Sequence, residues 1–166
     1  IADYKKLVRE AREQNPSFHI TSDLIIGFPG ETEDEFQETI NTIQEVGFGD
    51  MHIFSYSRRD GTPAARMRHH LPKAVKKARS RVVHNLARRM QQEALIPQLH
   101  KPTRILWETL GTSLSTQQPV WLGYTENYFR VETPASDKID LSNQITLLTP
   151  EKVVKGGRLW GPATLD

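Results

Sequence analysis

The most constraining feature of the sequence is an apolar run that leads directly into a glycine loop and a capped helix. Residues 24–26 (LII) are typical of a strand buried on both faces. A loop with two glycines follows at 27–30, and Thr32 and Glu35 then have the spacing of a helical capping box. A strand, a short loop and a capped helix in this order favour a βα unit of a parallel sheet.

The flanking segments extend this pattern. Apolar residues at helical spacing predict a helix over residues 2–14, and extended character predicts a strand within 18–27. The capped helix is expected to end at Gly47, and residues 51–56 (MHIFSY) predict a second strand. A short helical turn is expected at 64–67. We therefore expect the first part of the chain to have an α/β fold.

A long helix is predicted from Lys73 to about Leu95. Its packing face is expected to carry four apolar residues within one arc, namely Val75, Ala78, Val82 and Leu86. The opposite side is expected to form a basic ridge of Lys73, Lys77, Arg81, His84 and Arg88.

Beyond Pro102 the sequence consists of short strand-like runs separated by turn residues. This spacing predicts a small antiparallel β-barrel of about 60 residues. The expected strands lie at residues 104–109, 119–123, 129–133, 145–148 and 158–160.

The charges are sorted along the chain although the net charge is only +2. Residues 1–57 carry 4 basic and 11 acidic side chains, residues 58–101 carry 12 and 2, and residues 102–166 carry 6 and 7. The basic middle indicates either a surface for a polyanion or an ordinary solvated helix face.

Several classes of protein are excluded by composition. The 166 residues contain no cysteine, so the chain alone cannot form a disulfide, a thiolate zinc site or an iron–sulfur cluster. No cluster of histidine and carboxylate residues has metal-ligand spacing, so no metal site is expected. The sequence has neither a transmembrane run nor a secretory signal, which indicates a cytoplasmic protein without membrane contact. Its start at Ile1 hints at a processed or truncated product.

Two adjacent strand ends are the candidate ligand site. Residues 27–32 (GFPGET) follow the first strand, and residues 56–63 (YSRRDGTP) follow the second. Ligands bind at the carboxyl ends of parallel strands, where glycines let the backbone approach them. The glycine loop is equally compatible with a tight βα turn that binds nothing.

Residues 23–36 (DLIIGFPGETEDEF), followed by 52–57 (HIFSYS) and 61–65 (GTPAA), resemble the radical S-adenosylmethionine (SAM) methylthiotransferases. The resemblance continues to the C-terminus. Residues 50–54 (DMHIF) and 121–128 (WLGYTENY) look most like the branch that acts on N6-threonylcarbamoyladenosine in tRNA. Sister branches act on isopentenyladenosine in tRNA or on an aspartate of a ribosomal protein.

The resemblance implies a chain in three parts. Residues 1–68 would be the C-terminal part of a TIM-like radical-SAM α/β barrel, 69–100 a basic connecting helix, and 101–166 a TRAM-like RNA-binding β-barrel. The parent enzyme would use SAM and two [4Fe–4S] clusters, whose ligands are expected in an upstream portion of the same polypeptide. The chain would then hold no catalytic residue and would be inactive by itself.

The resemblance also implies which residues bind SAM. Ile25 is expected to pack on the adenine ring, Gly27 and Gly30 to admit close backbone approach, and the backbone from Phe54 to Tyr56 to border the adenine. Glu31 is a further candidate, but the loop before it is one residue longer than is usual in radical SAM proteins. Its place at a helix N-terminus also suits a structural role.

An RNA-binding surface is expected along the connecting helix and on the β-barrel. Trp121 and Phe129 are expected in the barrel core, whereas nearby tyrosines suit base stacking. The candidate contacts are Arg58, Arg59, Arg66, Lys73, Lys77, Arg81, Arg88, Tyr124, Tyr128 and Arg130. The implied partner is tRNA, contacted in its anticodon region.

Three functions remain open at this point. The first is the C-terminal part of a methylthiotransferase for threonylcarbamoyladenosine in tRNA. The second is the same class of enzyme acting on isopentenyladenosine tRNA or on a ribosomal protein. The third is an RNA-binding module without catalysis.

Overall fold

The computed structural model describes residues 1–16, 18–136 and 139–163. It divides the chain into two compact units, Ile1–Gln91 and Gln92–Asp166. Each unit contains its own cluster of buried apolar side chains. The boundaries expected near residues 68 and 100 divide the chain by the proposed function of each part and not by compactness. They stay a prediction.

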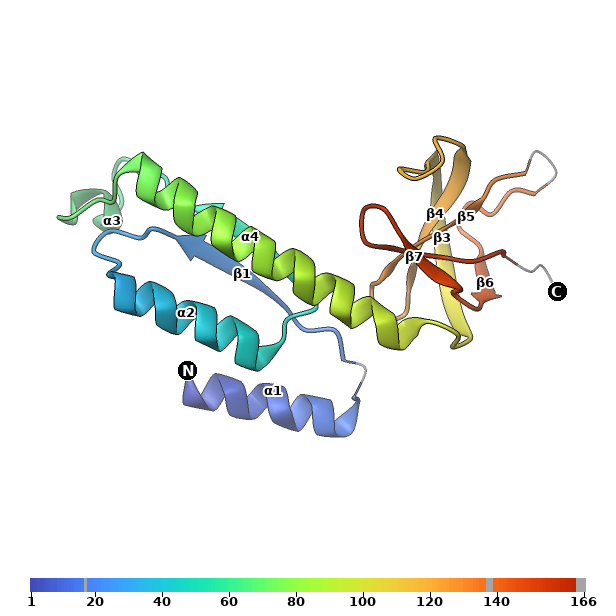
Figure 1. Cartoon of the computed structure of the whole chain (residues 1–166), viewed down its shortest axis with the longest axis horizontal. Helices are drawn as coiled ribbons and strands as arrows, with labels where there is room; N and C mark the ends of the chain where they lie inside the picture. The colour runs from blue at the N-terminus through green and yellow to red at the C-terminus, as the bar shows by residue number, and fades with distance from the viewer. Residues whose placement is uncertain (17, 137–138, 164–166) are drawn as a thin grey trace. The chain divides into compact units, whose positions relative to one another are not determined.

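The first unit has the predicted alternation of helices and strands (Figure 1). Strands β1 (Thr21–Ile26) and β2 (Asp50–Ser55) pair in parallel, with Thr21 opposite Asp50 and Ile26 opposite Ser55. The helices are α1 (Ala2–Gln14), α2 (Glu33–Val46), α3 (Pro63–Arg66) and α4 (Lys73–Leu95). The capping box is confirmed, and Gly47 ends α2 in the left-handed conformation.

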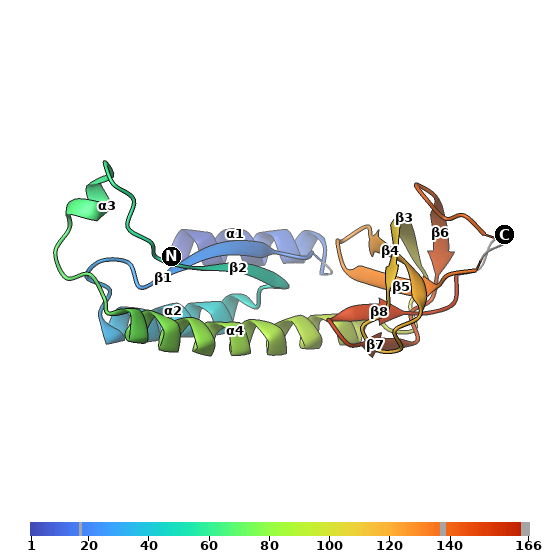
Figure 2. The ribbon, with the colours of Figure 1, turned by 90° about the horizontal axis from the view of Figure 1, so that it is seen from above.

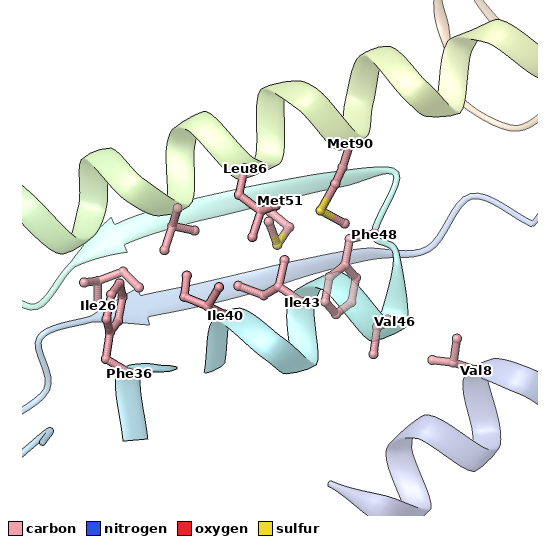
Figure 3. Close-up of a cluster of buried hydrophobic side chains, with 11 residues drawn as sticks. Val8, Ile26, Phe36, Ile40, Ile43, Val46, Phe48, Met51, Leu86 and Met90 are labelled. Carbon is pink, nitrogen blue, oxygen red and sulfur yellow. The ribbon is translucent and has the colours of Figure 1, made fainter. Parts of the chain in front are cut away.

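One face of the two-stranded sheet is covered. Helices α2 and α4 lie on the same side of β1 and β2 (Figure 2). Between these layers Ile26, Ile43 and Met51 are buried together with Leu86 and Met90 of α4 (Figure 3). Burial of such side chains contributes about 1.5–3 kcal/mol each.

The prediction that the first strand is buried on both faces is wrong. Ile25 is 53% exposed and its register partner Phe54 is 55% exposed. Both point away from the face that the helices cover, and within the described residues no element packs over them. An apolar sequence alone does not reveal which side of a strand has a partner.

The predicted packing face of α4 is confirmed for Leu86 and wrong for the other three residues, of which Ala78 is exposed. Val75 and Val82 are exposed by 37% and 47%, whereas Val83, Leu86 and Met90 are buried. The buried stripe is therefore turned by roughly a quarter of the helix circumference, because successive residues lie 100° apart. Two basic residues, Lys76 and Arg79, lie on this stripe, and the charges hid it from a search for apolar periodicity.

The second unit is built on a mixed sheet in the order β6-β3-β4-β5-β8-β7. The expectation of a closed antiparallel barrel is not met: the sheet is not closed, and β5 pairs with β8 in parallel. The prediction placed five strands correctly within a few residues and missed β7. The strands are β3 (Thr103–Thr112), β4 (Pro119–Thr125), β5 (Arg130–Pro134), β6 (Ile145–Leu148), β7 (Lys152–Val154) and β8 (Arg158–Trp160).

The core of this unit contains the two aromatic residues that were expected there. Trp121 and Phe129 are each 6% exposed and pack in one cluster with Trp107. Buried Glu132 accepts hydrogen bonds from Ser113 and Arg158 at 2.6 and 2.8 Å, so its charge is paired.

Candidate functional site

The two predicted strand-end loops lie at the same edge of the first unit. Because β1 and β2 are parallel and in register, Gly27 and Tyr56 follow at the same end of the sheet. The Tyr56 amide donates to the Ile26 carbonyl at 2.8 Å, which prolongs the ladder beyond the strands. Gly27 and Gly30 have φ of 74° and 87°, a conformation that favours glycine. The loop is thus a tight turn in which Gly27 is buried and Gly30 is exposed.

Aromatic rings gather at this edge. The ring of Phe28 meets that of Tyr56 edge-on at 5.4 Å between centroids, and His70 lies 5.8 Å from Tyr56 on a different segment. The Gly30 amide donates to the His69 carbonyl at 3.0 Å. The segment before α4 therefore borders both loops. His69 and His70 were not predicted for this edge, because only their contacts distinguish them from the other residues of the basic stretch.

Glu31 points into the protein. Its carboxylate accepts from the Gly27 amide at 3.0 Å and from the Arg79 guanidinium at 2.6 Å. Arg79 also donates to the Glu31 carbonyl at 3.1 Å and to Glu33 at 2.8 Å. The Glu31 carboxylate thus holds the loop closed and attaches it to α4.

Arg79 is a buried cation, only 7% exposed. Burial alone would lower its pKa, but the hydrogen bonds and charges of Glu31 and Glu33 outweigh burial and hold the pKa above its ordinary value. Its guanidinium also lies 4.9 Å from the centre of the Phe36 ring. Arg79 therefore stays charged and paired, as a buried cation must.

Lys76, one turn earlier on α4, contacts the other loop. Its ammonium donates to the Tyr56 carbonyl at 2.9 Å. Its aliphatic chain covers Gly27 so closely that a Cβ there would collide with it. Neither Lys76 nor Arg79 was predicted as a site residue. No sequence signal marks them, because their place on one stripe with Val83, Leu86 and Met90 depends on contacts with residues far away in the sequence.

The apolar candidates Ile25 and Phe54 lie side by side on the uncovered face. They are register partners, each one residue before the last residue of its strand. The open face therefore presents an apolar pair next to the glycine loop. Gly30 itself has free space around the position of a Cβ.

The predicted RNA contacts of the first unit are all exposed. Lys73, Lys77, Arg81 and Arg88, the lysines and arginines of the basic ridge, lie on the solvent side of α4. Arg58 and Arg59 follow β2, and Arg66 lies in α3. Among the described residues, Arg58 lies 3.9 Å from the carboxylate of Asp60. No carboxylate of the described residues lies within ion-pair distance of the lysines and arginines of the basic ridge. The ridge is thus available to an external anion.

The three candidates of the second unit form one patch. Tyr124 and Arg130 are register partners, and the ring of Tyr128 lies 6.3 Å from that of Tyr124. Tyr128 is 78% exposed. Leu106 and Ile145 continue the cross-strand row from Tyr124 and are exposed as well. An exposed aromatic and apolar row with a cation at its end is suited to stacking with unpaired bases.

The described residues show no sign of a metal centre or of a membrane span. Among them, no three His, Asp or Glu side chains lie close enough together to hold a metal ion. No helix in the described ranges has the length and apolar character that crossing a membrane requires.

Comparison with known proteins identifies relatives over most of the chain. It is 34% identical to the threonylcarbamoyladenosine tRNA methylthiotransferase MtaB of Bacillus subtilis over 142 residues, which are 86% of this chain and 30% of that protein. It is 36% identical to MtaB of Thermotoga maritima, over 80% of this chain and 29% of that protein. It is 39% identical to the tRNA-2-methylthio-N(6)-dimethylallyladenosine synthase of Oceanobacillus iheyensis, over 75% of this chain and 23% of that protein.

These relatives are methylthiotransferases that modify tRNA. The chain belongs to the radical SAM methylthiotransferase family. It spans less than a third of the length of these relatives. No family profile matches it.

Proposed function

We propose that the chain is part of a tRNA methylthiotransferase that acts on N6-threonylcarbamoyladenosine in the anticodon region. Within that enzyme it supplies one side of the SAM pocket and much of the RNA-binding surface. The observation that carries this proposal is the pair of adjoining strand-end loops, 27–31 and 56–59, in a chain of this family.

The residues at the strand ends fit SAM. Ile25 and Phe54 offer an exposed apolar surface for an adenine ring, and the exposed Gly30 allows a ligand to approach the backbone closely. Gly27 is buried under Lys76, and the Tyr56 backbone is bound to Ile26 and Lys76, so these two residues fix the course of the loops. Glu31 belongs to this set as the residue that closes the loop, since its carboxylate already binds Gly27 and Arg79. SAM bound with an iron–sulfur cluster would supply the radical chemistry, while these residues bind and orient it.

The chain's own residues do not fit an iron–sulfur cluster, because all 166 positions lack cysteine. In the proposed enzyme both [4Fe–4S] clusters are held by another part of the polypeptide. We expect the chain by itself to be inactive. Methylthiolation by the chain without a cluster-bearing part would contradict this.

The RNA is proposed to contact the basic ridge and the patch around Tyr124. Each lysine or arginine near a phosphate releases a counterion, so the ridge supplies affinity that falls with salt. Tyr124, Tyr128 and Arg130 would stack on unpaired bases of the anticodon loop. Arg58, Arg59 and Arg66 would add phosphate contacts beside the strand-end site.

The choice of threonylcarbamoyladenosine rests on residues 50–54 and 121–128 and on the two MtaB relatives. The isopentenyladenosine branch is the second candidate, because relatives named for it match at 36–39% identity. Action on a ribosomal protein and an RNA-binding role without catalysis are the remaining alternatives.

The test uses the complete gene product with reconstituted clusters. Two anticodon stem-loops of identical sequence, one with threonylcarbamoyladenosine and one with isopentenyladenosine, are offered with SAM, and product nucleosides are identified by mass spectrometry. We expect the methylthio group on the first substrate only. Modification of the second alone would assign the sister branch, and binding of both without modification would favour the RNA-binding module.

A further inference from the structure

The basic residues of helix α4 differ in their surroundings. The basic ridge is exposed, whereas on the stripe that includes Val83 and Leu86 Arg79 is buried and Lys76 is half-buried. Placing cations on a buried stripe costs desolvation free energy, which specific contacts must offset. The contacts of Lys76 and Arg79 are therefore the features of α4 that its packing alone does not explain.

We propose that Lys76 and Arg79 are positioning residues for the SAM site, an inference that rests on the function proposed above. Lys76 holds the Tyr56 carbonyl at 2.9 Å. Arg79 holds the Glu31 carbonyl and carboxylate at 3.1 and 2.6 Å. One turn of a single helix thus fixes the loops that follow both β1 and β2.

The contacts reach the start of the glycine loop. The Glu31 carboxylate bound by Arg79 also accepts from the Gly27 amide, so Arg79 acts on the start of the glycine loop through Glu31. The stem of Lys76 covers Gly27 directly. The distance between the two loops, which sets the width of the site, is determined by residues three positions apart on a rigid helix.

Each of these residues has a matched control two positions or fewer away. Lys77 and Arg81 are exposed members of the basic ridge with the same charge. Methionine keeps the length of the side chain and much of its apolar contact, so Lys76→Met removes the hydrogen bond but leaves cover over Gly27. Lys76→Arg retains a donor and a charge near Tyr56.

The experiment measures the Kd of SAM by equilibrium dialysis, the Kd of tRNA and the Tm of the complete gene product with reconstituted clusters. We expect Lys76→Met and Arg79→Met to raise the Kd of SAM about tenfold or more, a loss that corresponds to one positioned interaction. Lys77→Met and Arg81→Met should leave the Kd of SAM within about twofold and weaken tRNA binding instead. Lys76→Arg should recover most of the SAM affinity.

The outcomes separate this inference from the proposed function. If the unmodified protein binds no SAM, the proposed function and this inference both fail. If it binds SAM and Lys76→Met binds it equally well, only the positioning role is overturned. A lower Tm with unchanged SAM affinity in Lys76→Met would likewise assign a purely structural role. Lys76→Met carries the test alone if Arg79→Met does not fold.

Discussion

At the scale of single residues, the start of α2 is held by two reciprocal hydrogen bonds. The Glu35 amide donates to the Thr32 hydroxyl at 3.2 Å, and the Thr32 amide donates to the Glu35 carboxylate at 2.8 Å. Spacing alone predicted this pair, because a capping box depends only on residues three apart. The helix it starts directly follows the glycine loop, so the box also fixes one end of that loop.

Thr32→Ala removes the side-chain cap and should lower the free energy of unfolding by about 1 kcal/mol. Urea denaturation of the chain measures this loss. Thr42→Ala, within α2 and away from its ends, is the control and should be neutral or slightly stabilising, since alanine favours helix. Equal losses in the two variants would show that the cap contributes nothing.

The same pair predicts a dependence on pH. Hydrogen bonds from the Thr32 backbone and then its side chain lower the pKa of Glu35 below its ordinary value of 4.5. A lowered pKa stabilises the fold above the ordinary value and loses this contribution as pH falls through the folded-state pKa. The stability difference between the wild type and Glu35→Gln should therefore be larger at neutral pH than in acid. A difference that stays constant from neutral to acid pH would contradict this.

At the scale of elements, the sequence placed helices and strands well but misjudged which sides are covered. Capping residues, glycines and apolar runs act locally, so the bounds of α2, β1 and β2 followed from the sequence. The buried stripe of α4 did not, because Lys76 and Arg79 belong to it and their burial depends on Tyr56 and Glu31, far away in sequence. For the same reason, the pairing of β5 with β8 is a long-range contact that strand spacing does not reveal.

Adjacent valines of α4 test its orientation. Val83 is fully buried and Val82 is 47% exposed. Val83→Asp would bury an unpaired charge and should destabilise the chain by about 3 kcal/mol or more, whereas Val82→Asp should cost about 1 kcal/mol or less. Urea denaturation of the two variants measures both losses of stability. A larger loss of stability in Val82→Asp than in Val83→Asp would support the packing face predicted from the sequence and contradict burial of Val83.

The basic ridge is tested by charge reversal in the complete gene product. Replacing Lys77, Arg81 and Arg88 with glutamate should weaken tRNA binding strongly. The slope of log Kd against log salt should fall by roughly one for each phosphate that the protein no longer neutralises. Filter binding over a series of salt concentrations measures both quantities. An unchanged affinity with an unchanged slope would remove the ridge from the RNA-binding surface.

At the scale of the whole molecule, the sequence predicted the strand-end loops of the candidate site. It did not predict the α4 residues that hold these loops in place. Gly27, Gly30 and Tyr56 follow from the order of strands, loops and helices. The inward turn of Glu31 and its partner Arg79 require the fold, since residues 48 positions apart must meet. The zero cysteine count, which excludes a cluster in this chain, agrees with a family member that spans less than a third of its relatives.

The most direct test of the central claim is nucleoside mass spectrometry of tRNA from a strain in which the gene is deleted. We expect the methylthio derivative of threonylcarbamoyladenosine to disappear and its unmodified precursor to accumulate, while methylthio-isopentenyladenosine is unchanged. The gene supplied on a plasmid should restore the missing nucleoside. Unchanged levels of the methylthio derivative of threonylcarbamoyladenosine in the deletion strain would contradict the account.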